Sequence, residues 1–300
     1  MLVLSRTDVE ALLDLDRLLD ALAGAHAELS AGDASLPPRV AAFSANGLLG
    51  AMPGYTPTAG MGAKLVSLFP GNTAPLPTHQ AAIVLFDAET GIATALMDGT
   101  YITAMRTAGA AALATRLLAR PNARVLAILG TGVQSQAAQE MFPRVRDVAE
   151  IRVAGRGEHE DAVRGADVVH CATHSPEPVV LRDWVAPGTH VSSVGYNTPG
   201  SELDPELVRA ADLVAVEARS SAFVAAPAGA PELAGVDPEA AVELGELVAG
   251  TRVGRTDPEQ ITLYKSVGIA VQDLAAAALV LAAARERGVG LEFELEEVHA

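Results

Sequence analysis

The chain has 300 residues, half of them apolar, a single cysteine and a formal net charge of −16 at pH 7. Two domains with a sizeable core fit this length, and the lone Cys171 excludes an internal disulfide or a cysteine-ligated metal and fits a reducing cytoplasm. The acidity argues against nucleic acid or an anionic membrane as a partner. The most apolar late segment, 267–284, is too short and too interrupted for a membrane span, and we expect no metal.

The first 120 residues predict two helices, an antiparallel sheet and a third helix. Apolar residues recur at helical spacing over 7–13 and 15–30. Short apolar runs at 62–69 and 81–86 are bounded by turn residues, which is typical of antiparallel strands. A run of small residues over 103–119 then predicts a long helix.

From residue 124 onward, strands and helices alternate. We expect strands at 124–129, 151–154, 166–173 and 190–194, and a helix at 134–141. Continuous apolar strands between helices indicate a doubly wound parallel sheet of the Rossmann type, hence an α/β fold.

That sheet is expected to be shortened. Only eight residues separate Arg156 from Gly165, too few for the usual crossover with its helix. We therefore expect a loop there, through Glu158 to Asp161. The late helix, from Val267, is expected to pack back on the first domain and make that domain discontinuous.

A glycine turn joins the strand at 124–129 to the helix that follows it. Gly130 and Gly132 form this turn, and Ser135 replaces the third glycine of the usual signature. Such a turn aims backbone N–H groups and the positive end of a helix at a pyrophosphate. The sequence therefore predicts a dinucleotide site, with an ordinary strand-to-helix turn as the alternative.

The end of the second strand selects between the two nicotinamide cofactors. NAD enzymes usually carry an acidic residue there for the ribose hydroxyls, whereas this chain has Ala154-Gly155-Arg156-Gly157. An arginine can clamp a 2′-phosphate. We expect a preference for NADP(H), with NAD(H) possible; a solvated surface arginine is the alternative.

Three cations lie in apolar or turn-rich surroundings. Arg39 follows two prolines, Lys64 lies inside an apolar strand and Arg106 lies near the start of a helix. Lysine is unusual in such a strand unless it faces solvent or pairs with an anion. If the three converge, they suit a carboxylate; singly, each is an exposed or structural charge.

Motifs spread along nearly the whole chain resemble the ornithine cyclodeaminase/mu-crystallin family. They occur in order, and their combination is specific although no single one is. They are Pro37-Pro38-Arg39-Val40, Gly62-Ala63-Lys64-Leu65-Val66, Phe69-Pro70-Gly71-Asn72, Leu76-Pro77-Thr78-His79-Gln80, Met97-Asp98-Gly99-Thr100-Tyr101-Ile102-Thr103-Ala104-Met105-Arg106-Thr107-Ala108, Gly130-Thr131-Gly132-Val133-Gln134-Ser135 and Ser266-Val267-Gly268-Ile269-Ala270.

The resemblance implies a homodimer with two domains per subunit. Residues 1–117 with 270–300 would form an α+β domain for substrate binding and dimerisation, and 118–269 the dinucleotide-binding domain. The resemblance also implies that Arg39, Lys64 and Arg106 hold a substrate carboxylate, with Met52 and His79 as further substrate contacts. The residues assigned to the cofactor are Thr78, Thr107, Gly130, Gly132, Val133, Gln134, Ser135, Arg156, Thr173, Val194, Ser266 and Gly268.

Two departures from the cyclodeaminase pattern bear on the reaction. The acidic residue that stands two positions before a Met-Pro pair in cyclodeaminases is Gly50 here, before Met52-Pro53. The catalytic aspartate of their Gly-x-Asp pattern is Asn197 here. An amide cannot act as a carboxylate base, so Asn197 is either a substrate contact or a plain turn residue.

We therefore expect NAD(P)H-dependent reduction of a small 2-imino acid or a cyclic imine carboxylate, of the ketimine or pyrroline-2-carboxylate type. The two arginines should lower the pKa of Lys64, which could then donate a proton. The alternatives are an ornithine cyclodeaminase, which forms proline and ammonia without net redox change, an alanine dehydrogenase, and a non-catalytic NADP(H)-binding protein.

Overall fold

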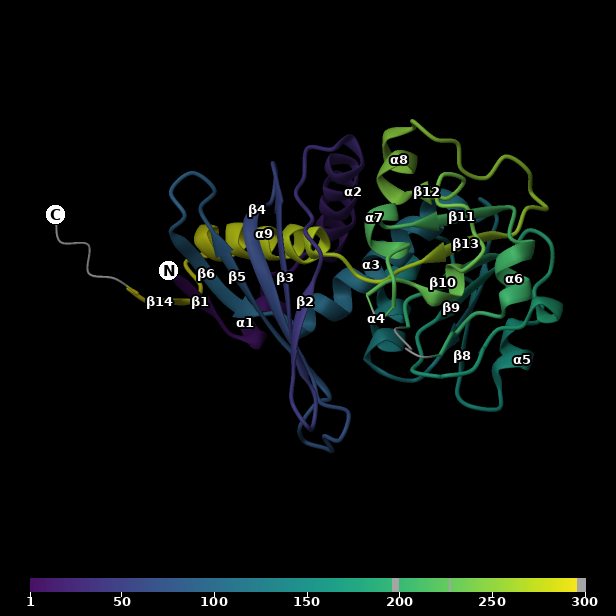
Figure 1. Ribbon diagram of the computed structural model, residues 1–300, viewed down its shortest axis with the longest axis horizontal. Coiled ribbons are helices and arrows are strands. Elements are labelled where there is room, and N and C mark those ends of the chain that lie inside the picture. Colours follow the sequence, from purple (N-terminus) through teal and green to yellow (C-terminus); the bar gives the residue numbers. More distant parts are fainter. Residues whose placement is uncertain (196–199, 227, 296–300) are drawn as a thin grey trace. The chain divides into compact units, whose positions relative to one another are not determined.

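The computed structural model describes residues 1–195, 200–226 and 228–295. The chain divides into two compact units, unit 1 (Met1–Arg106 with Ile269–Ala300) and unit 2 (Thr107–Gly268) (Figure 1). The first boundary between the units falls inside helix α3 (Thr100–Leu118). Arg106, the last residue of this part of unit 1, bonds through its side chain to Asp273 and Gln272 of the same unit.

Unit 1 contains a seven-stranded sheet in the order β14-β1-β6-β5-β4-β3-β2. The pairing of β1 with β6 is parallel and the other pairings are antiparallel. The strands are β1 (Leu2–Leu4), β2 (Val40–Phe43), β3 (Leu48–Thr56), β4 (Gly60–Leu68), β5 (His79–Phe86), β6 (Ala93–Asp98) and β14 (Leu291–Glu292).

Besides the first turns of α3, unit 1 contains α1 (Arg6–Leu12), α2 (Leu15–Ala31) and α9 (Ala270–Arg287). Helix α9 packs on β3, β4 and β5 (Figure 1). Two glycines in register on β3 and β4 allow this close approach. A Cβ on Gly54 would lie 3.1 Å from the Cβ of Ala270, and one on Gly62 would lie 2.9 Å from Leu274.

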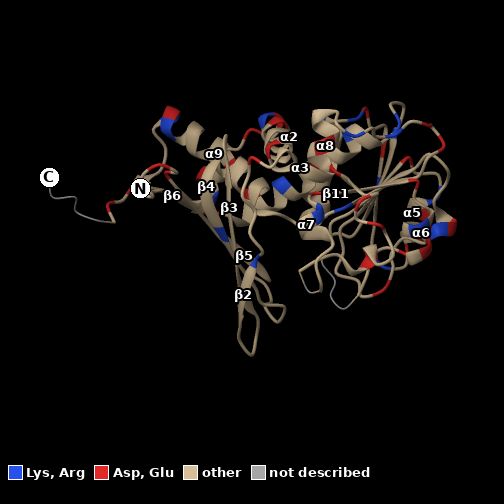
Figure 2. Cartoon of the chain, turned by 45° about the horizontal axis from the view of Figure 1, so that its top comes forward, with Lys and Arg blue, Asp and Glu red and all other residues tan. Residues whose placement is uncertain are grey.

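The opposite side of this sheet is apolar and exposed. Between Val40 and Phe86 the sequence has one charged residue, Lys64, which points toward α9. Figure 2 shows the ends of β2 to β5 almost without charged residues. Exposed large side chains on this side are Val40, Leu49, Met61, Leu65 and Phe86.

Unit 2 contains a parallel seven-stranded sheet in the order β12-β11-β13-β10-β9-β7-β8. It confirms the Rossmann-type α/β expectation. Its strands are β7 (Val125–Leu129), β8 (Glu150–Ala154), β9 (Val168–Cys171), β10 (His190–Ser193), β11 (Leu213–Val216), β12 (Val242–Glu243) and β13 (Thr262–Lys265). Its helices, besides the end of α3, are α4 (Val133–Met141), α5 (His159–Val163), α6 (Pro205–Ala210), α7 (Arg219–Ala222) and α8 (Leu244–Ala249).

The segment between β8 and β9 corrects one expectation. The structure has a five-residue helix, α5, where we expected a loop. Residues Ala162 and Val163 of α5 are buried in the core beneath it, so one helical turn suffices to cover this part of the sheet. The reduction is nevertheless evident, because β8 is the last strand at this end of the sheet.

No helix in the three described ranges is both long enough and apolar enough to cross a membrane. Within the same ranges, no group of three or more His, Cys, Asp or Glu side chains is arranged to hold a metal ion.

Candidate functional site

A buried carboxylate joins two of the three predicted cations of unit 1. Asp273, in the first turn of α9, lies 2.7 Å from the Nζ of Lys64 through one oxygen and 2.8 Å from the Nε of Arg106 through the other. All three side chains are buried. The structure thus brings Lys64 and Arg106, from β4 and α3, to one point beneath α9.

A second set of contacts fixes the orientation of Arg106. Its Nη1 donates to Oε1 of Gln272 at 2.7 Å. The Nε2 atom of the same Gln272 lies 3.1 Å from Nε2 of His26 on α2, and both side chains are buried. Helices α2, α3 and α9 therefore hold the guanidinium in a fixed place.

Arg39, which is half-buried just before β2, lies close enough to this group to lower the pKa of Lys64 slightly. Burial lowers the pKa of Lys64 to about 8, helped by the charge of Arg106; Asp273 opposes this shift, and Arg39 adds a smaller lowering. The expected lowering of the Lys64 pKa is confirmed, although burial rather than the arginines is its largest cause.

We call Arg39, Lys64, Arg106 and Asp273 the cation cluster. It contains three basic groups and one carboxylate, so it stays positive by charge count while all are ionised. The two bonds from Arg106 to Asp273 and Gln272 occupy two of its five N–H donors. Such a cluster suits one further anion of carboxylate size.

Other predicted substrate contacts are spread along the same sheet. Met52 is buried and lies opposite Lys64 in the register of β3 and β4. His79 is exposed and pairs with Leu68 of β4. Leu68 lies four residues along β4 from Lys64, which is about 13 Å along the strand. Thr78, assigned to the cofactor, lies beside His79 and its Oγ1 is 3.3 Å from the ring. The roles of these three residues stay predictions.

The glycine turn of unit 2 has the geometry that a pyrophosphate needs. Gly130 has a φ of +116°, and a Cβ there would lie 2.4 Å from the carbonyl oxygen of Ala172. Gly132 precedes the first turn of α4 without a side-chain cap, and a Cβ on it would meet only open space. The first N–H groups of α4 are thus accessible to an anion.

The first turn of α4 also fits a polar ligand. Val133 is 63% exposed at its first position, and the predicted contact Gln134 comes next. The buried Oγ of Ser135 has no hydrogen-bond partner within the described part of the chain. A dinucleotide would supply acceptors here, so the residues present fit this cofactor.

Most other predicted cofactor residues follow the carboxyl ends of parallel strands. Arg156 follows β8 and is exposed, Thr173 follows β9, and Val194 follows β10. Ser266 and Gly268 follow β13. The carboxyl ends of these parallel strands lie at one end of the sheet. The strand order reverses between β7 and β9. Dinucleotides bind at such a reversal point, at the carboxyl ends of the strands. Thr107, in α3, is buried at 7% exposure.

A fully buried glutamate ties two of these strand ends together. One oxygen of Glu202 accepts from the N–H and the Oγ1 of Thr173; the other accepts from Ser193 Oγ and Gly195 N–H, both at 2.8 Å. Lys265 donates to Ser193 Oγ at 3.0 Å and to the carbonyl of Gly195 at 2.8 Å. Its ammonium also lies 2.6 Å from a carboxylate oxygen of Glu232.

A second buried glutamate holds the segment after β13. Glu217 accepts from the Oγ of Ser266 at 2.8 Å and from the N–H groups of Val267 and Gly268 at 2.8 and 2.9 Å. Two predicted cofactor positions are thereby fixed by a carboxylate that the sequence did not single out.

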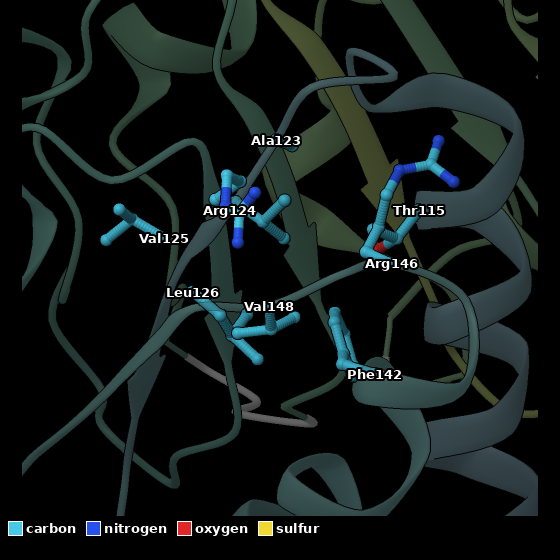
Figure 3. A pocket seen from close by; sticks show the side chains of 9 residues that line it. Thr115, Ala123, Arg124, Val125, Leu126, Phe142, Arg146 and Val148 are labelled. Atoms are coloured by element: carbon cyan, nitrogen blue, oxygen red, sulfur yellow. The ribbon is translucent and has the colours of Figure 1, made fainter.

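A small pocket in unit 2 lies elsewhere. Its lining includes Ala123, Val125 and Leu126, at the amino end of β7, together with Phe142 and Arg146 (Figure 3). The glycine turn follows the other end of β7. The pocket therefore does not coincide with the predicted dinucleotide edge.

Comparison with a family model shows the family of this chain. The model of the ornithine cyclodeaminase/mu-crystallin family matches residues 1–159 and 155–288. The chain belongs to this family. The match confirms the resemblance drawn from the motifs.

Similar proteins include reductases and a dehydrogenase. Mouse ketimine reductase mu-crystallin is 39% identical over 257 residues, covering 78% of this chain and 80% of the relative. The structure of Thermococcus litoralis Δ1-pyrroline-2-carboxylate reductase with NADH and L-proline has a TM-score of 0.89 at 33% identity, over 98% of this chain and all of that one. An archaeal alanine dehydrogenase dimer with bound NAD has a TM-score of 0.91 at 30% identity, over 99% of each chain.

Sequence reasoning missed the buried acids of both units. Asp273, Glu202 and Glu217 are each at most 1% exposed and each bonds to predicted site residues. A charge inside an apolar segment, such as Asp273 at 267–284, was the available signal. The predicted contact Asn197 lies outside the described residues.

Proposed function

We propose that this protein reduces a small 2-imino acid or a cyclic imine carboxylate to the amino acid, using NAD(P)H. The strongest support is the cation cluster, whose Lys64, Arg106 and Asp273 are buried and whose net positive charge matches a substrate carboxylate. Two similar proteins are described as a ketimine reductase and a pyrroline-2-carboxylate reductase.

The residues of the site would have different roles in the reaction. Arg106 and Arg39 would bind the carboxylate, and the ammonium of Lys64 would bind it or donate a proton to the imine nitrogen. A Lys64 pKa of about 8 suits proton donation near neutral pH, because the group is mostly charged there yet gives up its proton readily. The dinucleotide, when bound, supplies the hydride. The turn at Gly130 and Gly132 would hold its pyrophosphate.

An absorbance assay of purified protein tests the proposal. Oxidation of NADPH or NADH is followed with Δ1-pyrroline-2-carboxylate, Δ1-piperideine-2-carboxylate, and pyruvate mixed with ammonium or methylamine. We expect turnover with at least one cyclic imine. No oxidation across this panel would overturn the reductase proposal.

Three alternatives are separated by the same assay together with ornithine as a further substrate and a thermal-stability measurement. Turnover confined to pyruvate with ammonium would instead establish an alanine dehydrogenase, a possibility supported by the similar archaeal enzyme. Ornithine converted to proline and ammonia without net change in NADH would establish the cyclodeaminase. Gly50 argues against the latter, because it places no carboxylate where cyclodeaminases carry one. A non-catalytic binder would be stabilised by NADPH and not further by a carboxylate.

For the cofactor we propose a preference for NADP(H), because Arg156 follows β8 where NAD enzymes usually carry an acid. Arg156→Ala should lower kcat/KM for NADPH about tenfold to a hundredfold, since one charge-assisted contact is worth about 1.5–3 kcal/mol. The value for NADH should hardly change. Arg209→Ala, at an exposed position of α6, is the control. Equal losses with both cofactors, or faster wild-type turnover with NADH, would contradict the assignment.

We further propose that the protein forms a homodimer through the exposed apolar side of the unit 1 sheet. Leu49 and Val40 are 50% and 64% exposed there, on strands that carry no charge on this side. Exposed apolar faces of this kind mark interfaces, and the similar alanine dehydrogenase is described as a dimer.

The single, buried Cys171 suits a cytoplasmic protein.

A further inference from the structure

Asp273 has a place in the cation cluster that substrate binding alone does not explain. Its carboxylate is fully buried and uses one oxygen for each of two cations. Removing a carboxylate from water is unfavourable unless charged donors surround it. Its position depends on Gly54 and Gly62, which let α9 approach the sheet closely.

We propose that Asp273 is a positioning residue, which holds the Lys64 ammonium and the Arg106 guanidinium side by side in their charged forms so that the substrate carboxylate can bind to both. The inference rests on the proposed function of the cluster. Asp273 neutralises only one of three basic groups, so the cluster still attracts a second carboxylate. The ammonium of Lys64 has three N–H donors, and one of them points to Asp273. The others can donate to a second carboxylate.

The charges around Lys64 show what Asp273 contributes. Arg106 of α3 and Arg39, which precedes β2, lower the pKa of Lys64, and burial lowers it most; Asp273 of α9 raises it. His26 of α2 reaches this group only through Gln272 and Arg106. Without the carboxylate, the lowering contributions act unopposed. The ammonium then loses its proton at lower pH, and the substrate carboxylate loses the charged Lys64 donor.

The first measurement is the affinity of the protein for pyrrole-2-carboxylate as a function of pH, by calorimetry. This planar anion cannot be reduced, and its charge is constant between about pH 6 and 9. For the wild type we expect affinity to fall above about pH 8, as Lys64 loses its proton. For Asp273→Asn the fall should begin at least about one pH unit lower, with affinity at pH 8 reduced about tenfold or more. Glu286→Gln, an exposed carboxylate on the same helix, should behave like the wild type.

The second measurement is imine reduction by the same variants. Asp273→Asn should raise KM for the imino acid about tenfold or more, whereas KM for the nicotinamide cofactor should change less than about twofold. A merely structural role for Asp273 would lower the melting temperature without moving the pH dependence. An unchanged pH dependence in a folded Asp273→Asn variant therefore overturns the inference.

One double variant keeps the test decisive. If Asp273→Asn does not fold, Lys64→Met combined with Asp273→Asn removes one charge of each sign and should fold; its affinity should no longer fall near pH 8. A fall near pH 8 that persists in this double variant overturns the inference, because Lys64 is then not the titrating group. Wild type that binds the anion with the expected pH dependence but oxidises no cofactor refutes the proposed function alone.

Discussion

Gly130 and Gly132 lie two residues apart in one turn but meet different requirements. Gly130 has a positive φ, and a Cβ there would contact the Ala172 carbonyl oxygen at 2.4 Å. Gly132 has an extended backbone and open space where a Cβ would be. The first glycine serves the fold, whereas we expect the second to serve the cofactor.

Alanine at each position separates these roles. Gly130→Ala should lower the free energy of unfolding by about 2–4 kcal/mol, through backbone strain and the contact with Ala172. Gly132→Ala should lower it by less than about 1 kcal/mol but weaken cofactor binding about tenfold or more, because the methyl group would stand where the pyrophosphate approaches. Urea unfolding and fluorescence titration with NADPH measure both quantities. Equal stability losses in the two variants would contradict this division.

Lys64 and Asp273 show what a sequence can and cannot predict about single residues. Lys64 was singled out because a lysine in an apolar strand needs a reason, and the structure supplies one in Asp273. Asp273 is itself a charge within an apolar segment, yet its partners are more than a hundred residues away in the chain. The packing of α9 on β4 makes them neighbours. A local sequence pattern cannot show a contact between segments so far apart in the chain.

Among the elements, the ends of β9 and β10 depend on Glu202. Its carboxylate receives hydrogen bonds from Thr173, Ser193 and Gly195 at the edge where we expect the cofactor. Glu202→Gln replaces one acceptor oxygen by an NH₂ group that faces donors. We expect the free energy of unfolding to fall by about 2–4 kcal/mol, because buried donors lose their acceptor, and KM for the cofactor to rise.

Glu206→Gln provides the matched control for Glu202. It changes an exposed carboxylate of α6, four residues away in the chain, and should change the free energy of unfolding by less than about 0.5 kcal/mol. Denaturant unfolding and initial rates at varied NADPH concentration give the two readouts. A Glu202→Gln protein as stable as this control would show that the buried carboxylate does not hold the strand ends.

Long periodic elements were predicted well, and so were the four-residue strands β9 and β10, whereas several other short elements were not. The expected helix 15–30 corresponds to α2, and the strand 124–129 to β7, within one residue at each end. Strands β11 and β13 were not predicted, although they lie inside the parallel sheet. Each has four residues, too few for periodicity to distinguish a buried strand from a loop. Helix α5 was missed for the same reason, because one turn shows no repeat.

At the scale of the whole molecule, the unit 1 sheet has two unlike sides. One packs against α9 and holds the cation cluster, while the other exposes apolar side chains such as Leu49 and Leu65. The chain carries a net charge of −16, yet Val40 to Phe86 contains a single charged residue. Excluding charge from a long exposed segment is typical of a surface that another molecule covers.

Leu49→Glu tests whether a second copy of the chain covers this side. Leu49 is 50% exposed, so in a monomer the new carboxylate would reach water and do little harm. In a two-fold interface the charge would be buried twice, which should dissociate the dimer. Light scattering after size exclusion should give twice the 30.8 kDa chain mass for the wild type and the chain mass for the variant.

Val253→Glu is the control for this substitution. Val253 is 72% exposed in unit 2 and lies outside the sheet, so a glutamate there should leave the mass at that of a dimer. A wild type with the mass of one chain, or a Leu49→Glu variant that stays dimeric, would contradict the proposed interface. Circular dichroism of both variants checks that the fold is kept, since dissociation rather than unfolding is the expected consequence of burying two carboxylates.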